Sequence, residues 1–368
     1  MPDAVPPSLQ PDEAFRQRVL LICRIVLAAL ALIIAMVWCV QVLIVVFAGV
    51  LGAVLLRTIA ERIHRMTRLP TGWSLALGCT TLLAVLVTAG WLMAPSVGAQ
   101  LDQLSEQLPR AVRGLTANLE QYEWGRWLKA QGEQATNGGQ GTVSTAAKFV
   151  STTVGIGGTL LVVFFLSIYL AAQPQLYISG LLHLFPIARR QRVHAMLDEC
   201  GFELRWWLLG QLFAMLLVGT LTTLGLWALG LPLALILGVI AGLLNFVPNF
   251  GPWIAAVPGI LIALSQGPTT AAWAAGVYLG AQVIESYLVT PMIQQRTVSL
   301  PPALTIAVQV LIGLLLGIVG LTIATPLLVV ILVIVKMGYV EGVIGEHVDL
   351  PGRDRDRKRV PTPILSRA

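Results

Sequence analysis

Charged side chains are missing from long stretches of this chain, and that absence limits its fold more than any other feature. Five stretches contain no Asp, Glu, Lys or Arg: residues 25–56, 69–101, 149–188, 206–284 and 297–335. Each is longer than the roughly 20 residues with which a helix crosses the hydrocarbon core of a bilayer. Backbone polar groups in lipid need internal partners, and a helix supplies them. The sequence therefore predicts an all-α, polytopic integral membrane protein.

The composition agrees with a membrane location and disfavours other classes. The chain is 56% hydrophobic and 11% charged, with a mean hydropathy of +0.81, far above soluble domains. Its net charge of +6 does not indicate nucleic-acid binding, because the basic residues flank apolar stretches and alternate with acids. They are expected to set orientation and to contact the anionic lipid of the bilayer. The four cysteines lack paired spacing and the four histidines form no cluster, so neither a metal site nor a cofactor is expected.

Apolar and polar stretches divide the chain into five expected parts. They are a cytoplasmic tail (1–18), three membrane helices (19–95), an extracytoplasmic amphipathic helical insert (96–148), a transmembrane core (149–340) and a charged cytoplasmic tail (341–368). Residues 19–56 have the length of two short helices that turn near Trp38, and Pro95 is expected to end the third helix. The insert is predicted to be helical because leucines recur at spacings of three and four from Leu101 onward.

A stretch in the core, residues 187–207, places bases, acids and aromatic residues on a helical repeat before the chain turns apolar again. It is predicted to form an interfacial helix on the cytoplasmic face. A further span is expected to follow it and to end near Gly230.

Two apolar regions of the core are expected to be broken. In residues 233–264 the stretch NFVPNFGPWIAAVPG carries prolines that cannot continue a helix, which predicts two short helices with an irregular linker. The uncharged run 303–335 is about ten residues longer than one span needs and contains several glycines and Pro326, so it too is expected to fold back. Irregular backbone in lipid is tolerated only beside protein or a wet cavity, and interrupted segments point to transport sites. A simple turn at the membrane surface is the alternative for the first break.

The two breaks supply most of the candidate residues for a solute or ion pathway. The first break contributes Asn245, Pro248, Asn249, Gly251 and Pro252, and the second contributes Gly313, Gly317 and Gly320. If each broken region is a hairpin, the chain has six full spans plus two broken or re-entrant hairpins, about eight membrane segments. Both termini then lie in the cytoplasm, in agreement with the positive-inside rule.

An acid inside the membrane region adds a further candidate. Glu285 is the only charged residue between Arg205 and Arg296, and a carboxylate isolated in hydrocarbon is expensive, which favours a function in proton or cation coupling. Gln282 lies three residues earlier on the same helical face. The alternative is a structural pair with Arg296, which we expect at the cytoplasmic interface together with Arg189 and Arg190.

Motifs of other functional classes are absent from the sequence. There is no GxxxxGK[ST] loop for ATP hydrolysis, and neither HExxH nor GxSxG is present. The chain is therefore not expected to be an enzyme, which leaves movement of something across the membrane.

Four motifs together resemble a known family. They are FVPNFGP (246–252) with Pro258, ESYLVTPMI (285–293), VSLPP (298–302) and GLLLGIVGLTIATP (313–326). In order and spacing they resemble the autoinducer-2 exporter family of bacterial transporters, also described as PerM-like permeases. The resemblance implies a bacterial inner-membrane protein with eight membrane segments that forms a homo-oligomer and uses no ATP. It also implies either export of the autoinducer-2 signal or sodium–proton antiport, so it does not choose a cargo.

The leading hypothesis is a secondary, ion-coupled exporter of a small solute, with sodium ion or proton as the coupling partner. In this hypothesis the two breaks face each other and Glu285 with Gln282 supplies coupling. The alternatives are a cation/proton antiporter, a passive oligomeric channel, or a membrane scaffold or regulator that binds a partner through residues 101–129.

Overall fold

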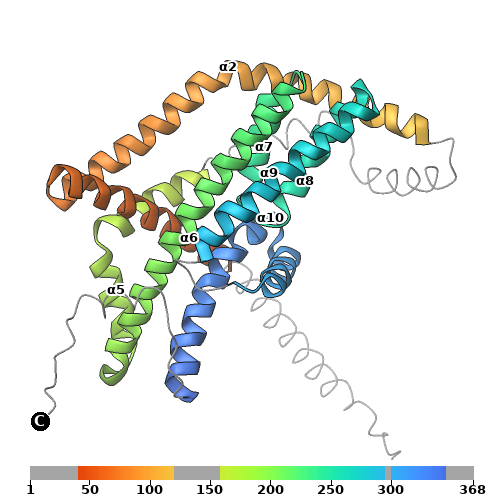
Figure 1. Ribbon diagram of the computed structural model, residues 1–368. Helices are drawn as coiled ribbons and strands as arrows, with labels where there is room; N and C mark the ends of the chain where they lie inside the picture. The colour runs from red at the N-terminus through yellow and green to blue at the C-terminus, as the bar shows by residue number, and fades with distance from the viewer. Residues whose placement is uncertain (1–39, 120–157, 295–299, 345–368) are drawn as a thin grey trace, which may run out of the picture. The chain divides into compact units, whose positions relative to one another are not determined.

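The computed structural model describes residues 40–119, 158–294 and 300–344, and its regular structure there is helical throughout (Figure 1). Two helices without a label span Val40–Thr67 and Gly158–Ala172. The labelled elements are α2 (Thr71–Leu119), α5 (Pro174–His183), α6 (Ile187–Ala228), α7 (Ala234–Leu244), α8 (Gly251–Gln266), α9 (Pro268–Gln294), α10 (Pro302–Ile334) and the π-helix η1 (Val335–Ile344). The chain divides into two units, with the boundary between Ala48 and Gly49. The expected N-terminal tail, the first turn near Trp38, residues 120–148 of the expected insert and residues 345–368 of the charged tail lie outside the described residues.

Membrane-length helices are present, as the charge pattern predicts. Within the described ranges four helical segments have the length and apolar composition to cross a bilayer: Val40–Thr67, Thr71–Gln107, Ile187–Ala228 and Pro302–Glu341. The last of them is interrupted at Gly317. A fifth span results if Gly158–Ala172 and α5, which meet at a bend of 84°, are counted as one. Helix α9 has 27 residues but contains no 18-residue stretch as apolar as those of the four candidate spans. The all-α membrane class is confirmed, and the count of eight segments stays a prediction.

Helix α2 does not end at Pro95 as expected. It runs for 49 residues, with Pro95 and Pro109 inside it. A proline removes one hydrogen bond and bends a helix, but residues on both sides can keep helical dihedral angles. The part after Pro95 packs on the core: Leu104 is buried, and the Gln100 Oε1 atom accepts a hydrogen bond of 2.9 Å from the backbone N–H of Ile236 at the start of α7.

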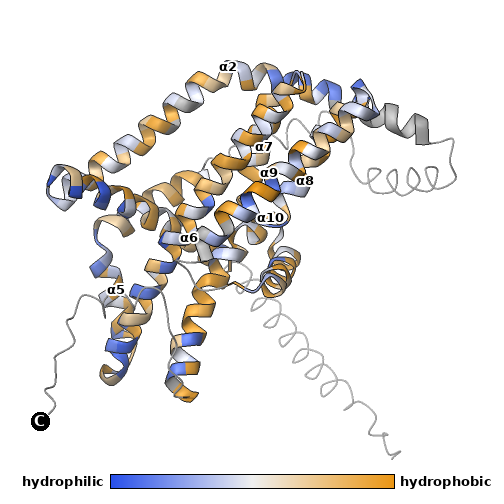
Figure 2. Cartoon of the chain, in the orientation of Figure 1, coloured by the Kyte–Doolittle hydropathy of each residue, from blue (hydrophilic) through white to orange (hydrophobic). Residues whose placement is uncertain are grey.

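The expected interfacial helix 187–207 is likewise not a separate element. It is the first half of α6, a single helix of 42 residues. No proline lies between Pro186 and Pro232, and a change of side-chain polarity does not interrupt backbone hydrogen bonds. Figure 2 shows hydrophilic residues in the N-terminal half of α6 and apolar ones beyond it. The helix ends at Ala228. Gly230, two residues later, has a φ of 73°, in the left-handed region that favours glycine. The predicted stop near Gly230 is therefore confirmed.

The first broken region has the expected form. Helices α7 and α8 have 11 and 16 residues, and residues 245–250 between them are not helical. The linker closes through short-range hydrogen bonds, from the N–H of Phe250 to the carbonyl of Pro248 and from that of Gly251 to Val247, each 2.9 Å. A Cβ atom at Gly251 would collide with the carbonyl of Leu244, so only glycine permits this return of the chain.

The second broken region folds back at Gly317. This residue has φ 66° and ψ −151°, inside a segment that is helical on both sides. A Cβ atom on Gly320 would lie 2.7 Å from the carbonyl oxygen of Ile312, and one on Gly313 would lie 3.4 Å from a methyl carbon of Leu321. Residues eight positions apart are about 12 Å apart along a straight helix. The two arms of α10 therefore form a tight hairpin, as the glycine pattern predicts.

Close packing of α6 against α7 supports the first break. A Cβ atom on Gly242 would be 2.8 Å from the carbonyl oxygen of Met215 and 3.2 Å from the Cα atom of Gly219. Gly238 and Gly242 thus allow α7 to pack closely on α6, as their GxxxG spacing predicts. Buried residues of α6 to α9 form the surrounding core, among them Leu226, Leu237, Ala255, Ile262 and Ala274.

Replacement of Gly317 tests the hairpin. Gly317→Ala should lower stability by about 1–3 kcal/mol, because its φ and ψ lie in a region that is essentially restricted to glycine. No atom lies within 4 Å of an added Cβ, so the effect isolates backbone strain from steric clash. The measurement is the thermal unfolding midpoint of the purified protein in detergent. Gly276→Ala is the matched control, since Gly276 is helical and equally open, and it should leave the midpoint unchanged or raise it.

Candidate functional site

A buried glutamine joins the two broken regions. Gln309, on the first arm of α10, has 0% exposure. Its side-chain N–H₂ donates to the carbonyl oxygen of Pro248 at 2.9 Å and to the hydroxyl of Thr325 at 3.0 Å. Its Oε1 atom accepts a hydrogen bond of 3.3 Å from the side-chain amide of Asn249. One amide group on the first arm of α10 therefore contacts the linker of the first break and the second arm of α10, whereas the predicted residues Gly313, Gly317 and Gly320 do not contact that linker.

The first break presents its polar groups to Gln309 through an uncommon backbone conformation. Asn249 has φ 69°, and asparagine adopts this left-handed region more readily than most residues. Pro248 has no N–H, so its carbonyl is the only backbone hydrogen-bonding group that it offers. The carbonyl receives both the Phe250 N–H and the Gln309 amide.

A second glutamine satisfies the end of α7. The buried Gln211 of α6 donates its amide N–H to the carbonyl oxygen of Asn245 at 2.5 Å. The last carbonyls of a helix have no partner within the helix, so a side chain from a neighbouring helix supplies one here. The first break is thus held by glutamines from two sides, Gln211 and Gln309.

Glu285 lies on α9 beside the core and is partly buried. The Gln282 amide donates a hydrogen bond of 2.9 Å to its Oε2 atom, and the hydroxyl of Ser286 contacts the same oxygen at 3.5 Å. The expected side-by-side position of Gln282 and Glu285 is present. The alternative partner, Arg296, lies outside the described residues. Pro252, at the start of α8, and Gln282 line one cavity, which brings the end of the first break close to this pair.

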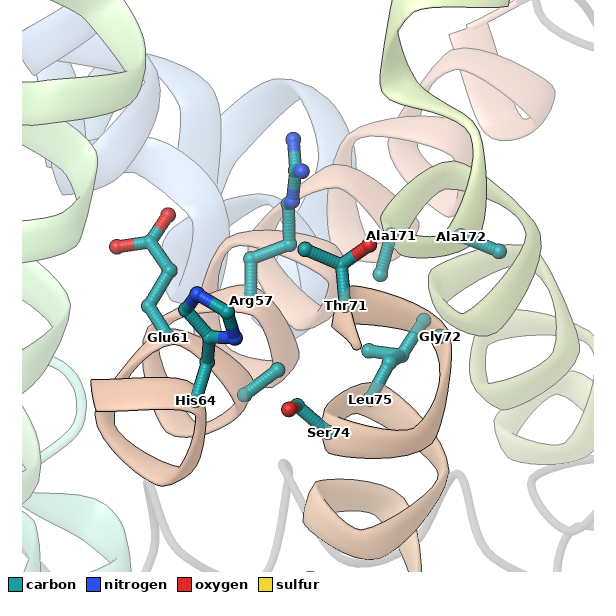
Figure 3. A pocket seen from close by; sticks show the side chains of 10 residues that line it. Arg57, Glu61, His64, Thr71, Gly72, Ser74, Leu75, Ala171 and Ala172 are labelled. Atoms are coloured by element: carbon teal, nitrogen blue, oxygen red, sulfur yellow. The ribbon is translucent and has the colours of Figure 1, made fainter. Parts of the chain in front are cut away.

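The C-terminal part of the helix Val40–Thr67 and the start of α2 line a separate polar pocket. A cavity of about 220 Å³ is lined by Arg57, Glu61, His64, Thr71 and Ser74, with Ala171 and Ala172 on its far side (Figure 3). Glu61 accepts a hydrogen bond of 2.6 Å from Arg205, which joins this end of the helix Val40–Thr67 to α6. The pocket therefore contains both signs of charge, and this favours a structural role in joining helices.

The remaining candidates are placed as follows. Arg189 is exposed at the start of α6, and the Arg190 side chain donates to the carbonyl of Phe185 at 3.1 Å. Gly317 forms the turn of the α10 hairpin. Gly313, on the first arm, packs against the second arm, and Gly320, on the second arm, packs against the first.

Sequence reasoning missed the glutamines that organise this site. Gln309 and Thr325 stand in the uncharged run 303–335, and Gln309 is its only side-chain amide. A polar amide surrounded by apolar residues in a membrane segment usually finds an interhelical partner, and that signal would have selected it. Glu199 and Glu203 were also missed: both are buried in α6, within the segment that was predicted to be interfacial.

Comparisons with known proteins agree with a membrane transporter. A family model described as AI-2E family transporter matches residues 26–339. Two proteins of Bacillus subtilis, named "Putative transport protein YrrI" and "Putative transport protein YueF", are 26% and 24% identical. The matches cover 70% and 72% of this chain and 78% and 76% of those proteins. A Mycobacterium tuberculosis protein, "Putative transport protein MT0215", is 26% identical over 61% of this chain and 66% of its own length.

Removal of the Gln309 amide tests whether it holds the two breaks together. Gln309→Leu should lower stability by more than about 2 kcal/mol, because the Pro248 carbonyl, the Asn249 amide and the Thr325 hydroxyl each lose a buried partner. The measurement is thermal unfolding in detergent. Gln103→Leu makes the same change at an exposed position of α2 and should shift stability by less than about 0.5 kcal/mol. Equal effects of the two substitutions would contradict a structural link through Gln309.

Proposed function

We propose that this chain, which belongs to the AI-2E transporter family, carries a small solute across a bacterial inner membrane by secondary, ion-coupled export at the junction of its two broken helical regions. The contact of Gln309 with Pro248, Asn249 and Thr325 is the observation that carries the proposal. It joins the irregular backbone of the first break to side chains from both helical arms of the second, at one buried place.

The physics of a bilayer favours a transport site at such a place. Irregular backbone is tolerated at membrane depth only where protein surrounds it or where it lines a wet cavity. In secondary transporters interrupted helices supply free amide and carbonyl groups for solutes and ions. The groups at this junction are amides, a carbonyl and a hydroxyl, all uncharged, which suits a small polar solute or a partly dehydrated ion.

Glu285 is the proposed coupling group. A carboxyl group in an apolar setting changes its charge when it binds a proton or a sodium ion, and its interactions with the surroundings change with it. The hydrogen bond from Gln282 would transmit a change of charge at Glu285 to the first break, because Gln282 lines a cavity together with Pro252 at the end of that break. Binding at Glu285 would then bias the position of α8 and of the linker before it.

Orientation and assembly complete the proposal. The basic residues near Arg57 and at the start of α6 are proposed to face the cytoplasm, together with both termini. The names of the relatives state transport and no cargo, so the solute is left to experiment. A homo-oligomer is proposed from the resemblance alone.

Neutralisation of Glu285 tests the coupling. Purified protein is reconstituted into liposomes that contain a mixture of small metabolites, and efflux is followed by mass spectrometry with and without an imposed proton or sodium gradient. The native protein should release at least one solute faster under a gradient. Glu285→Gln should remove about nine tenths or more of this acceleration, because the neutral amide cannot change its charge.

The matched control is Glu106→Gln. Glu106 is exposed on α2, where it pairs with the equally exposed Arg110, and its replacement should leave gradient-driven efflux intact. Gradient-driven efflux that survives in Glu285→Gln would refute the coupling role. Efflux that follows the solute gradient alone in the native protein would instead favour a passive channel.

A further inference from the structure

The polar pocket beside the end of the helix Val40–Thr67 has no role in the proposed transport. Its volume is about 220 Å³, and polar and apolar side chains share its wall. The polar part includes Arg57 and Thr71, and the apolar part includes Leu75, Ala171 and Ala172. The pocket thus offers hydrogen-bonding groups beside an apolar surface, away from the junction of the two broken regions.

Glu61 does not neutralise Arg57 in this pocket. Among the described residues of the wall, Glu61 is the one acid. Its carboxylate accepts the hydrogen bond from Arg205 and lies 4.0 Å from the guanidinium of Arg65. Figure 3 shows this carboxylate apart from the Arg57 guanidinium, although the two residues are four positions apart on one helix. The charge of Glu61 is therefore balanced by Arg205, and Arg57 gives the pocket a net positive charge.

Arg57 and Thr71 both have donors available for a ligand. Neither side chain has a hydrogen bond or an ion pair within the part of the chain that the structure describes, and both are exposed. The carbonyl of Leu69 accepts hydrogen bonds from His64 at 2.5 Å and from Ser74 at 3.2 Å, which holds the turn between the two helices. Because this turn fixes α2 against the preceding helix, it also fixes Thr71 relative to Arg57.

A phosphate group suits these donors. The N–H groups of a guanidinium form a planar fork that matches the oxygens of a phosphate, and the resulting hydrogen bonds are charge-assisted. One water takes about 30 Å³ in the liquid, so the cavity has room for the five heavy atoms of a phosphate and for part of an ester. We propose that this pocket binds a phosphate group, with the Arg57 guanidinium and the Thr71 hydroxyl as its donors.

The surroundings of the pocket favour a phospholipid as the source of the phosphate. Trp73, one residue beyond Gly72 of the wall, is 72% exposed, and tryptophan is enriched at the level of the lipid headgroups. Residues 57–68 contain four arginines and one acid, a composition that attracts anionic lipid. The apolar wall formed by Leu75 and Ala171 would contact the first carbons of the lipid.

The inference goes beyond the proposed function, because neither Arg57 nor Thr71 belongs to the junction or to the coupling group. Lipid binding can be measured without a gradient and without transport. The outcome is therefore independent of the efflux experiment with Glu285→Gln.

Native mass spectrometry of the full chain in detergent measures the binding. The titrants are dioleoylphosphatidylglycerol, dioleoylglycerol, which has the same chains without the phosphate, and glycerol phosphate, which has the phosphate without the chains. The protein should bind the phospholipid saturably and at least about tenfold more tightly than dioleoylglycerol, the advantage expected of a charge-assisted hydrogen bond. Glycerol phosphate that displaces the phospholipid at an equal concentration would support the site and assign it to a soluble phosphate ester.

Three variants locate the binding. Arg57→Gln should weaken binding of the phospholipid about twentyfold or more and leave that of dioleoylglycerol unchanged. Arg62→Gln is the matched control, since Arg62 is exposed on the same helix and does not line the pocket. It removes the same charge and should weaken binding no more than about fivefold, the general contribution of one arginine near a membrane. Thr71→Val preserves every charge and should weaken binding about three- to tenfold.

The proposal is overturned by any of three results. One is an equal loss in Arg57→Gln and Arg62→Gln, which would mean general attraction to anionic lipid. Another is native binding in Thr71→Val. The third is equal affinity of the native protein for the phospholipid and dioleoylglycerol, which would mean a contact with acyl chains alone.

Discussion

The need of every backbone polar group for a partner inside a bilayer governs this structure. Long helices meet it within themselves, and α6 and α10 do so over most of their length. Where the chain leaves the helix, side chains must take over. Gln211 donates to the carbonyl of Asn245, Gln309 donates to that of Pro248, and Gln100 accepts from the N–H of Ile236 near the start of α7. Three glutamines from three helices thus satisfy backbone groups of the short helix α7 and its linker.

Glycines at the same places allow the backbones to approach closely. Gly219, Gly238 and Gly242 let α6 and α7 approach closely enough for Gln211 to reach the linker. Gly251 allows the chain to pass the end of α7, and Gly317 reverses α10 so that Gln309 and Thr325 meet. The polar contacts depend on this packing, because a hydrogen bond needs a separation near 3 Å and a bulkier residue would hold the backbones apart.

These contacts form a connected series that a transport cycle could use. It leads from Glu285 through Gln282 to the cavity that Gln282 and Pro252 line, then through Pro252 and the first linker to Gln309 and the second hairpin. The side chains in the series after Glu285 are uncharged. Such groups can exchange a hydrogen bond with each other for one with a solute at small net cost, whereas a buried ion pair could not. The series therefore combines one ionisable group with a neutral path.

The sequence alone determined the membrane class, the family, the two breaks and the stop near Gly230, because uncharged runs, prolines and glycines act through local backbone chemistry. The prediction that α2 ends at Pro95 is wrong, because a proline can bend a helix without ending it. The prediction of a separate helix 187–207 is wrong as well, because a change of side-chain polarity does not interrupt the backbone hydrogen bonds of α6. Only the tertiary structure identified Gln309 and Gln211, and only it placed the first linker in contact with α10. Each of these depends on which side chain of a distant segment fills a particular gap, and hydrogen-bond partners 34 to 61 residues apart leave no periodic trace along the chain.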